Sequence, residues 1–205
     1  MMCSILLEFG DYLYGIVSKT NVYSYNIVDK NGKTDPDIMA KAIIDAVNDN
    51  VDLINISLGS YFDNRQVRDA VNYAYKKEVI VVASAGDYGS TQLLYPARYE
   101  QCISVGAKDS CELIWPDTDG SEKCDIIAPG VDITAIDENR NKILSTGTSQ
   151  AAILVSGYVL LLKDYAKTNG ISLNVSDVKR ILHRVNNKEI SFIDGFSEIK
   201  KCDRK

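Results

Sequence analysis

Five apolar or β-branched segments, with stretches of helical spacing among and after them, most constrain what this chain can fold into. Several are almost uninterrupted in apolar residues, which is typical of strands buried on both faces of a parallel sheet. The predicted strands cover residues 22–28, 51–58, 79–85, 102–107 and 124–128.

Between these segments, apolar residues recur every three or four positions, as they do on one face of a helix. Asp35 and Pro36 precede the first such stretch as a cap and a first-turn proline. Further helices are predicted at 64–77, from about Ser149, and at 176–186. This alternation predicts a doubly wound α/β domain that binds ligands at the carboxyl ends of its strands.

Length and charge limit the organisation and the classes of partner. The 205 residues contain no repeat and no Pro/Gly/Ser-rich linker, so residues 1–205 are predicted to form a single domain. A net charge of -5 with scattered lysines and arginines argues against nucleic acid as a partner. The longest apolar stretch, 151–162, is too short to span a bilayer, and the first residues lack the pattern of a signal peptide. No membrane partner is expected, and the compartment is left open.

The five cysteines are an odd number without C-x-x-C spacing. This spacing argues against a metal site and against a fully paired disulfide framework. We expect reduced, structural thiols and assign no metal ligands.

Four blocks with chemical character follow the predicted strands. They are Ser57-Leu58-Gly59, Ala83-Ser84-Ala85-Gly86-Asp87, Ala128-Pro129-Gly130 and Gly147-Thr148-Ser149. Together, in this order and spacing, they resemble the subtilisin-like serine peptidases, or subtilases, over about residues 5–199. The resemblance implies a doubly wound, mostly parallel sheet of the subtilisin type.

Ser149 is the candidate nucleophile. Gly147-Thr148-Ser149 places a hydroxyl in the first turn of a helix, where free backbone N–H groups and the positive end of the helix dipole lie. That position suits an acyl-transfer nucleophile, and it equally suits a plain helix cap. The resemblance implies the nucleophile, with the Ser149 N–H contributing to the oxyanion hole.

The resemblance also implies a peptide-binding groove. Its walls would bind an extended peptide backbone and the P1 side chain, the residue that precedes the scissile bond. The alternative from the residues alone is that small side chains and glycines merely end buried strands tightly. The substrate-binding residues implied are Ser57, Leu58, Gly59, Ala83, Ser84, Ala85, Gly86 and Thr148.

The sequence departs from the family in its catalytic partners. A serine hydroxyl needs an adjacent base that is itself oriented by a carboxylate, but neither the family's aspartate block nor its H-G-T block is present. The only histidine, His183, follows Ser149 in a stretch that the family uses for packing. We therefore expect a sheet that lacks its N-terminal strands, with the Asp and His supplied by upstream residues of the natural protein or by a second chain.

Asp87 is a further departure, because it stands where the family has an asparagine that donates to the oxyanion. A carboxyl group donates there only when it is protonated. Asp87 is therefore an atypical oxyanion-hole residue.

Two functional hypotheses follow. The first is a serine endopeptidase domain that hydrolyses polypeptides through Ser149, truncated so that the chain alone is inactive or nearly so. The second is a non-catalytic pseudo-subtilase that binds peptides or regulates another protein. A doubly wound nucleotide-binding domain is a weaker third reading, because no phosphate-binding glycine loop is present. No cofactor is assigned; calcium is implied by the family only, without an identified site.

Overall fold

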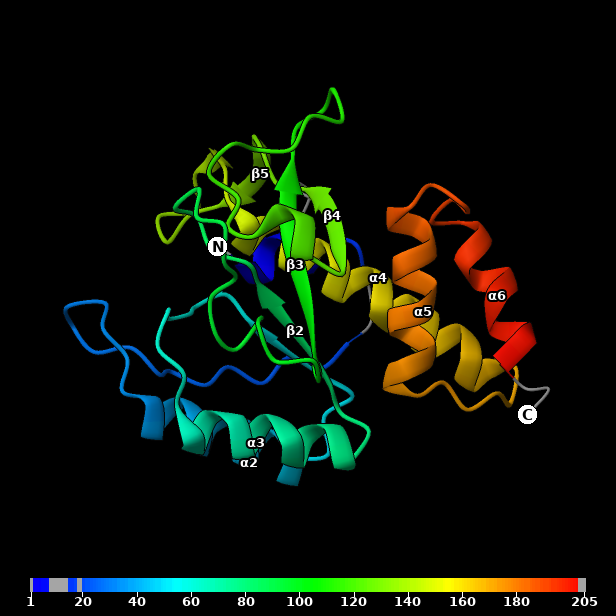
Figure 1. Ribbon diagram of the computed structural model, residues 1–205, viewed down its shortest axis with the longest axis horizontal. Helices are drawn as coiled ribbons and strands as arrows, with labels where there is room; N and C mark the ends of the chain where they lie inside the picture. Colours follow the sequence, from blue (N-terminus) through cyan, green and yellow to red (C-terminus); the bar gives the residue numbers. More distant parts are fainter. Residues whose placement is uncertain (1, 8–14, 18–19, 203–205) are drawn as a thin grey trace.

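A four-stranded parallel sheet forms the centre of the computed structural model, which describes residues 2–7, 15–17 and 20–202 (Figure 1). Neighbours in the sheet follow the order of the chain, β1-β2-β3-β4, and every pair is parallel. The strands are β1 (Leu53–Ile56), β2 (Ile80–Ser84), β3 (Cys102–Lys108) and β4 (Ile126–Pro129). Each lies within one of the segments predicted from apolar runs or extends it by one residue.

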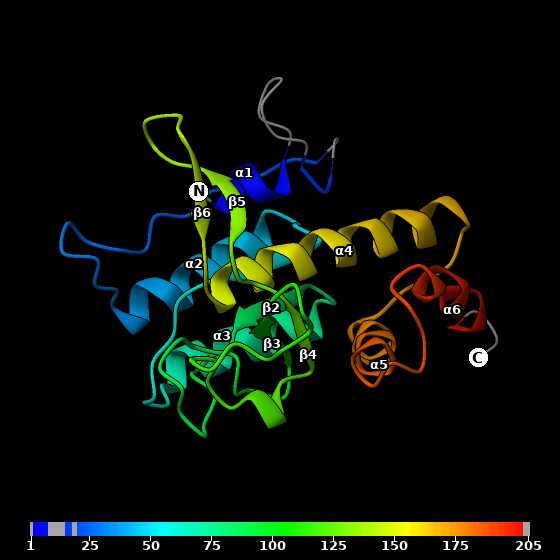
Figure 2. The ribbon, with the colours of Figure 1, turned by 90° about the horizontal axis from the view of Figure 1, so that it is seen from above.

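Helices cover both faces of the sheet (Figures 1 and 2). Alternate residues of β2 show this directly: Ile80 and Val82 pack into one core and Val81 and Ala83 into the other. Helices α2 (Pro36–Asn48) and α3 (Arg65–Lys76) supply the second core, and α4 (Thr148–Thr168) and α5 (Val175–Asn186) supply the first. The predicted doubly wound α/β class is confirmed.

Local sequence explains where these helices begin. The Asp35 side chain accepts from the Asp37 N–H, and Pro36 occupies the first helical position of α2. Asn64 caps α3 in the same way, by accepting from the Val67 N–H. Side chains of this type satisfy backbone donors that have no partner within the helix.

The strand predicted at 22–28 is wrong. These residues form no strand and pair with none of the described strands, and Val22 and Tyr23 are 43% and 56% exposed. The apolar pattern is that of a strand, but a strand also needs a hydrogen-bonded neighbour, and none of the described residues provides one here.

Several smaller elements complete the structure, of which the hairpin and the last helix were not predicted. An antiparallel hairpin joins β5 (Ile133–Ile136) to β6 (Lys142–Ser145), and helices α1 (Met2–Leu6) and α6 (Asp194–Cys202) lie near the two ends of the chain. At the hairpin turn, the Asp137 side chain accepts from two following backbone N–H groups. Such short elements carry too few residues for a periodic signal.

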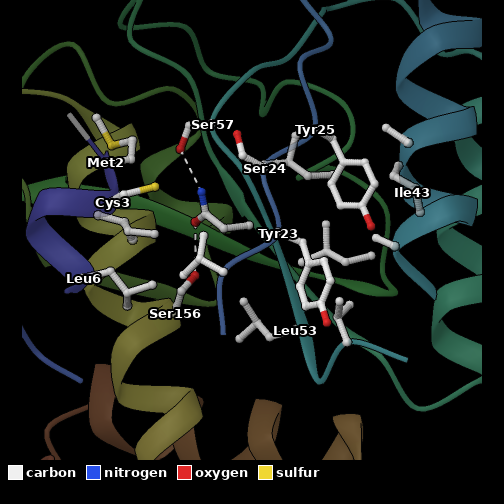
Figure 3. Close-up of a pocket in the computed structure, with 18 of the residues that line it drawn as sticks. Met2, Cys3, Leu6, Tyr23, Ser24, Tyr25, Ile43, Leu53, Ser57 and Ser156 are labelled. Atoms are coloured by element: carbon white, nitrogen blue, oxygen red, sulfur yellow. Dashed lines mark hydrogen bonds between the residues drawn. The ribbon is translucent and has the colours of Figure 1, made fainter. Parts of the chain in front are cut away.

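The outer edge of β1 is open, since no strand among the described residues pairs with it. The Asp52 carbonyl accepts from the Ile80 N–H, so the main-chain groups of Leu53 and Asn55 face away from β2. A cavity of about 650 Å³ adjoins this edge, between β1 and residues 20–25 (Figure 3). Helices α1, α2 and α4 contribute the remaining walls. The cavity is therefore a slot with an unpaired strand edge on one side.

The five cysteines are free; Cys102 and Cys124 are buried, whereas Cys3 and Cys111 are exposed. Burial raises the pKa of the Cys124 thiol to about 12 and that of Cys102 further still. None of the helices in the described part is long and apolar enough to cross a membrane.

Glu198 ties α5 to α6 through a buried carboxylate. Hydrogen bonds from Lys201 and from Arg184 lower the pKa of Glu198 below its usual 4.5. Because the folded-state pKa is depressed, this contribution to stability is fully present above about pH 4.5 and is lost as the pH falls below it. Glu198→Gln should therefore lower the free energy of unfolding at pH 7 more than at pH 3.5, in urea titrations at both pH values. The exposed Glu122→Gln is the matched control, and equal losses at both pH values would contradict the assignment.

Candidate active site

Ser149 lies in the first turn of α4, at the carboxyl edge of the sheet. It is half-buried, and its hydroxyl donates to the Ser57 carbonyl at 3.4 Å. Gly147 precedes the helix with a φ of 152°, and a Cβ there would lie 2.9 Å from Asp87 Oδ2. The φ angle is one that favours glycine, and a side chain here would also displace the Asp87 carboxylate.

Thr148 connects the helix to the end of β2. Its buried hydroxyl accepts from the Gly86 N–H at 3.2 Å and donates to Asp87 Oδ1 at 2.7 Å. The Thr148 N–H donates to the same Asp87 oxygen at 2.8 Å. Gly147 has no side chain for capping, so Asp87 caps α4 from another segment and holds Ser149 in place.

Replacing Thr148 by valine should destabilise the protein by about 2 kcal/mol, because the buried Gly86 N–H loses its acceptor. Urea unfolding measures the change. Thr168→Val, at an exposed position of the same helix, is the matched control and should change stability by less than about 0.5 kcal/mol. Equal losses in the two variants would show that the hydroxyl network contributes little.

The exposed Asp87 carboxylate accepts two hydrogen bonds through Oδ1. The donor role expected at the oxyanion position needs a proton on the carboxyl group, so it stays a prediction. The geometry shown is that of a helix cap, which the sequence reasoning did not assign to Asp87.

The predicted groove walls lie next to one another at the ends of β1 and β2. Residues 57–59 directly follow β1, and residues 83–86 complete and follow β2. Segment 94–95 joins the two walls: the Leu94 N–H donates to the Ala85 carbonyl at 2.9 Å, and Tyr95 exchanges two hydrogen bonds with Ser60. The structure thus brings together the candidate residues from three distant parts of the chain.

A row of hydrogen-bonded side chains behind the site was not predicted from the sequence. Ser156 of α4 donates to Asn55 Oδ1 at 3.0 Å, and the Asn55 amide donates to the Ser57 hydroxyl at 3.1 Å (Figure 3). This hydrogen-bonded chain connects α4 and β1 to Ser57, whose carbonyl accepts from the Ser149 hydroxyl. Asn55 and Ser156 sit within apolar runs, and a polar residue that interrupts such a run is the only signal that could have identified them.

His183 does not join the site. It is exposed on α5, and its Nε2 lies 3.1 Å from the Asn187 amide nitrogen. Helix α4 begins beside the β5–β6 hairpin, whereas α5 lies toward the opposite end of the domain (Figure 2). The expectation that His183 is not the base agrees with this placement.

No group of three or more His, Cys, Asp or Glu side chains is placed to hold a metal ion within residues 2–7, 15–17 and 20–202. The calcium implied by resemblance stays a prediction without a site.

Comparisons with known proteins agree with the fold. Residues 4–196 match the model of the subtilase family. The chain is 34% identical over 155 residues to the thermophilic serine proteinase of Bacillus sp. (strain AK1), covering 76% of this chain and 39% of that protein. It is also 34% identical over 141 residues to the major intracellular serine protease of Bacillus subtilis (strain 168), covering 66% of this chain and 44% of that protein. The chain thus spans less than half the length of these two relatives.

A solved structure agrees over almost the whole chain. The self-cleaved protease domain of PatA superposes with a TM-score of 0.88 at 25% identity, covering 98% of this chain and 83% of that one. With the parallel sheet and the Gly147-Thr148-Ser149 turn at its carboxyl edge, these findings show that the chain belongs to the subtilase family.

Proposed function

We propose that this subtilase-family domain hydrolyses polypeptides by acyl transfer through Ser149, with a histidine and an aspartate supplied by polypeptide outside the described residues. The observation that carries the proposal is the position of the Ser149 hydroxyl in the first turn of α4, held by the Thr148–Asp87 network. Backbone N–H groups at a helix start stabilise the negative charge that develops during acyl transfer.

The chemistry follows the general serine peptidase template. Ser149 Oγ bonds to the peptide carbonyl carbon while its proton passes to the histidine, and the carbonyl oxygen becomes an oxyanion near the Ser149 N–H. The tetrahedral intermediate then breaks its C–N bond, and the leaving amine takes the proton. Water hydrolyses the acyl-enzyme by the same steps, which releases the acid and restores the Ser149 hydroxyl.

The open edge of β1 supports the proposal that the missing residues enter from another segment. A strand in the slot can use the free main-chain groups of Leu53 and Asn55. If it runs parallel to β1, it ends at the same edge of the sheet as Ser57 and Ser149. Residues that follow such a strand would then lie beside the nucleophile.

A fluorophosphonate probe tests the function on the protein as isolated from its source. Labelling at Ser149 is expected there, with its loss in Ser149→Ala, because an activated serine reacts far faster than an ordinary hydroxyl. The 205-residue chain by itself should label slowly or not at all. Absence of labelling in the protein from its source, with the fold intact, would overturn the proposed catalysis.

A non-catalytic, peptide-binding subtilase is the second candidate. It is favoured by Asp87, whose oxygen accepts hydrogen bonds where a donor to the oxyanion is needed. Peptide binding by the protein from its source, without labelling at Ser149, would establish this second function in place of the first.

A further inference from the structure

We propose that Leu94 closes the P1 pocket of this domain, so that the groove accepts peptides with a small side chain, glycine, alanine or serine, at P1. The inference rests on the proposed function, because it takes residues 57–59 and 83–86 as the two walls of that pocket. It adds the class of P1 side chain that the groove accepts and identifies Leu94 as the residue that selects it.

The Leu94 side chain lies against the glycines of both walls. A Cβ added to Gly59 would lie 2.7 Å from Leu94 Cβ and 3.1 Å from its Cδ1. A Cβ added to Gly86 would lie closest to Oδ2 of the buried Asp119, and then 2.7 Å from Leu94 Cγ and 2.8 Å from the same Cδ1. A single methyl group therefore lies close to both walls, and it fills the space where a P1 side chain would lie.

Main-chain hydrogen bonds hold Leu94 in this place. Its N–H donates to the Ala85 carbonyl at 2.9 Å, and its carbonyl accepts from the Arg98 N–H at 2.9 Å. The next residue, Tyr95, is bonded to Ser60 in both directions, at 2.8 and 3.0 Å. Leu94 is 6% exposed. Shifting the backbone of Leu94 would break these main-chain bonds, and the buried side chain has little room to turn aside, so a large P1 side chain does not simply displace it.

The consequence for selectivity follows from close packing. A methyl or hydroxymethyl group needs little space beyond the peptide backbone, whereas a benzyl group needs the volume that Leu94 fills. Forcing extra atoms into a filled site displaces side chains and backbone. We expect peptides with alanine at P1 to bind at least about tenfold more tightly than those with phenylalanine.

Two product-like peptides test this without requiring turnover: Ala-Ala-Pro-Ala and Ala-Ala-Pro-Phe, both with a free carboxylate. Their affinities are measured by calorimetry or NMR titration with the protein as isolated from its source, using wild type, Leu94→Gly and Leu94→Ala. The wild type should favour the alanine peptide by about tenfold, and both variants should bind the phenylalanine peptide at least about tenfold more tightly than wild type does. Leu94→Ala keeps a side chain at this position in case the glycine variant folds poorly.

Leu144→Ala is the matched control, because Leu144 is 66% exposed on the hairpin. It should leave both affinities unchanged. Equal binding of the two peptides by wild type would overturn the inference and leave the groove intact. An unchanged ratio of the two peptide affinities in folded Leu94→Ala would likewise overturn the inference. Failure of every folded form to bind either peptide would overturn the groove itself, and with it the proposed function.

Discussion

Replacing Ser149 by alanine is expected to lower peptide hydrolysis by about 10⁶-fold in the protein as isolated from its source, close to the loss known for the nucleophile of subtilisin, a member of this family. Alanine removes the oxygen that bonds to the substrate carbonyl, and the remaining N–H groups of α4 supply only the residual rate. The rate is measured with a chromogenic or fluorogenic peptide with alanine at P1.

Stability and peptide affinity should stay close to wild type in Ser149→Ala, because the serine hydroxyl makes only a long, 3.4 Å hydrogen bond to the Ser57 carbonyl. Ser172→Ala, an exposed serine in the loop between α4 and α5, is the control and should keep full activity. Undiminished hydrolysis by purified Ser149→Ala would rule out Ser149 as the nucleophile.

Leu162→Ala is expected to destabilise the protein by about 3 kcal/mol, the second large effect. Leu162 is fully buried on α4, within the core that the helix shares with the sheet and α5. Removing its side chain loses the transfer free energy of the buried carbons and leaves a cavity. The same helix carries Ser149 at its start, so its packing also holds the site in place.

Urea unfolding of Leu162→Ala measures this loss directly. The neighbouring Leu161 is 37% exposed, which makes Leu161→Ala a control of the same chemistry on the same helix. It should cost clearly less than Leu162→Ala, since more than a third of Leu161 stays in contact with water whereas Leu162 is fully buried. Similar losses in the two variants would mean that α4 does not bury the face that the structure shows.

Asp87 bears on both candidate functions, because it caps α4 and stands at the expected oxyanion position. As a cap on α4 it accepts from the Thr148 backbone and hydroxyl, which orients the turn before Ser149. As an oxyanion residue it would have to donate. The labelling and peptide-binding experiments above separate these readings because they report on Ser149 activation and on the groove independently.

Patterns within a single element were enough to predict most of the core. The nearly continuous apolar run of β2, buried at all five residues, and the caps Asp35 and Asn64 follow from local chemistry. The strand predicted at 22–28 failed because its pairing depends on a neighbour rather than on its own residues. The β5–β6 hairpin was not predicted because β6 alternates exposed and half-buried residues and has no continuous apolar run.

Part of the candidate site was likewise predicted from the sequence, and part was not. Ser149, Asp87 and the two walls were found from blocks of contiguous residues, and their family is confirmed by the match over residues 4–196. The sequence by itself therefore determined the family, the α/β class and the candidate nucleophile, because each is carried by short contiguous patterns. Only the tertiary structure decided that Asp87 caps α4, that Leu94 lies between Gly59 and Gly86, and that a cavity adjoins the open edge of β1. These features depend on distances between residues far apart in the chain, which packing sets and local pattern does not encode.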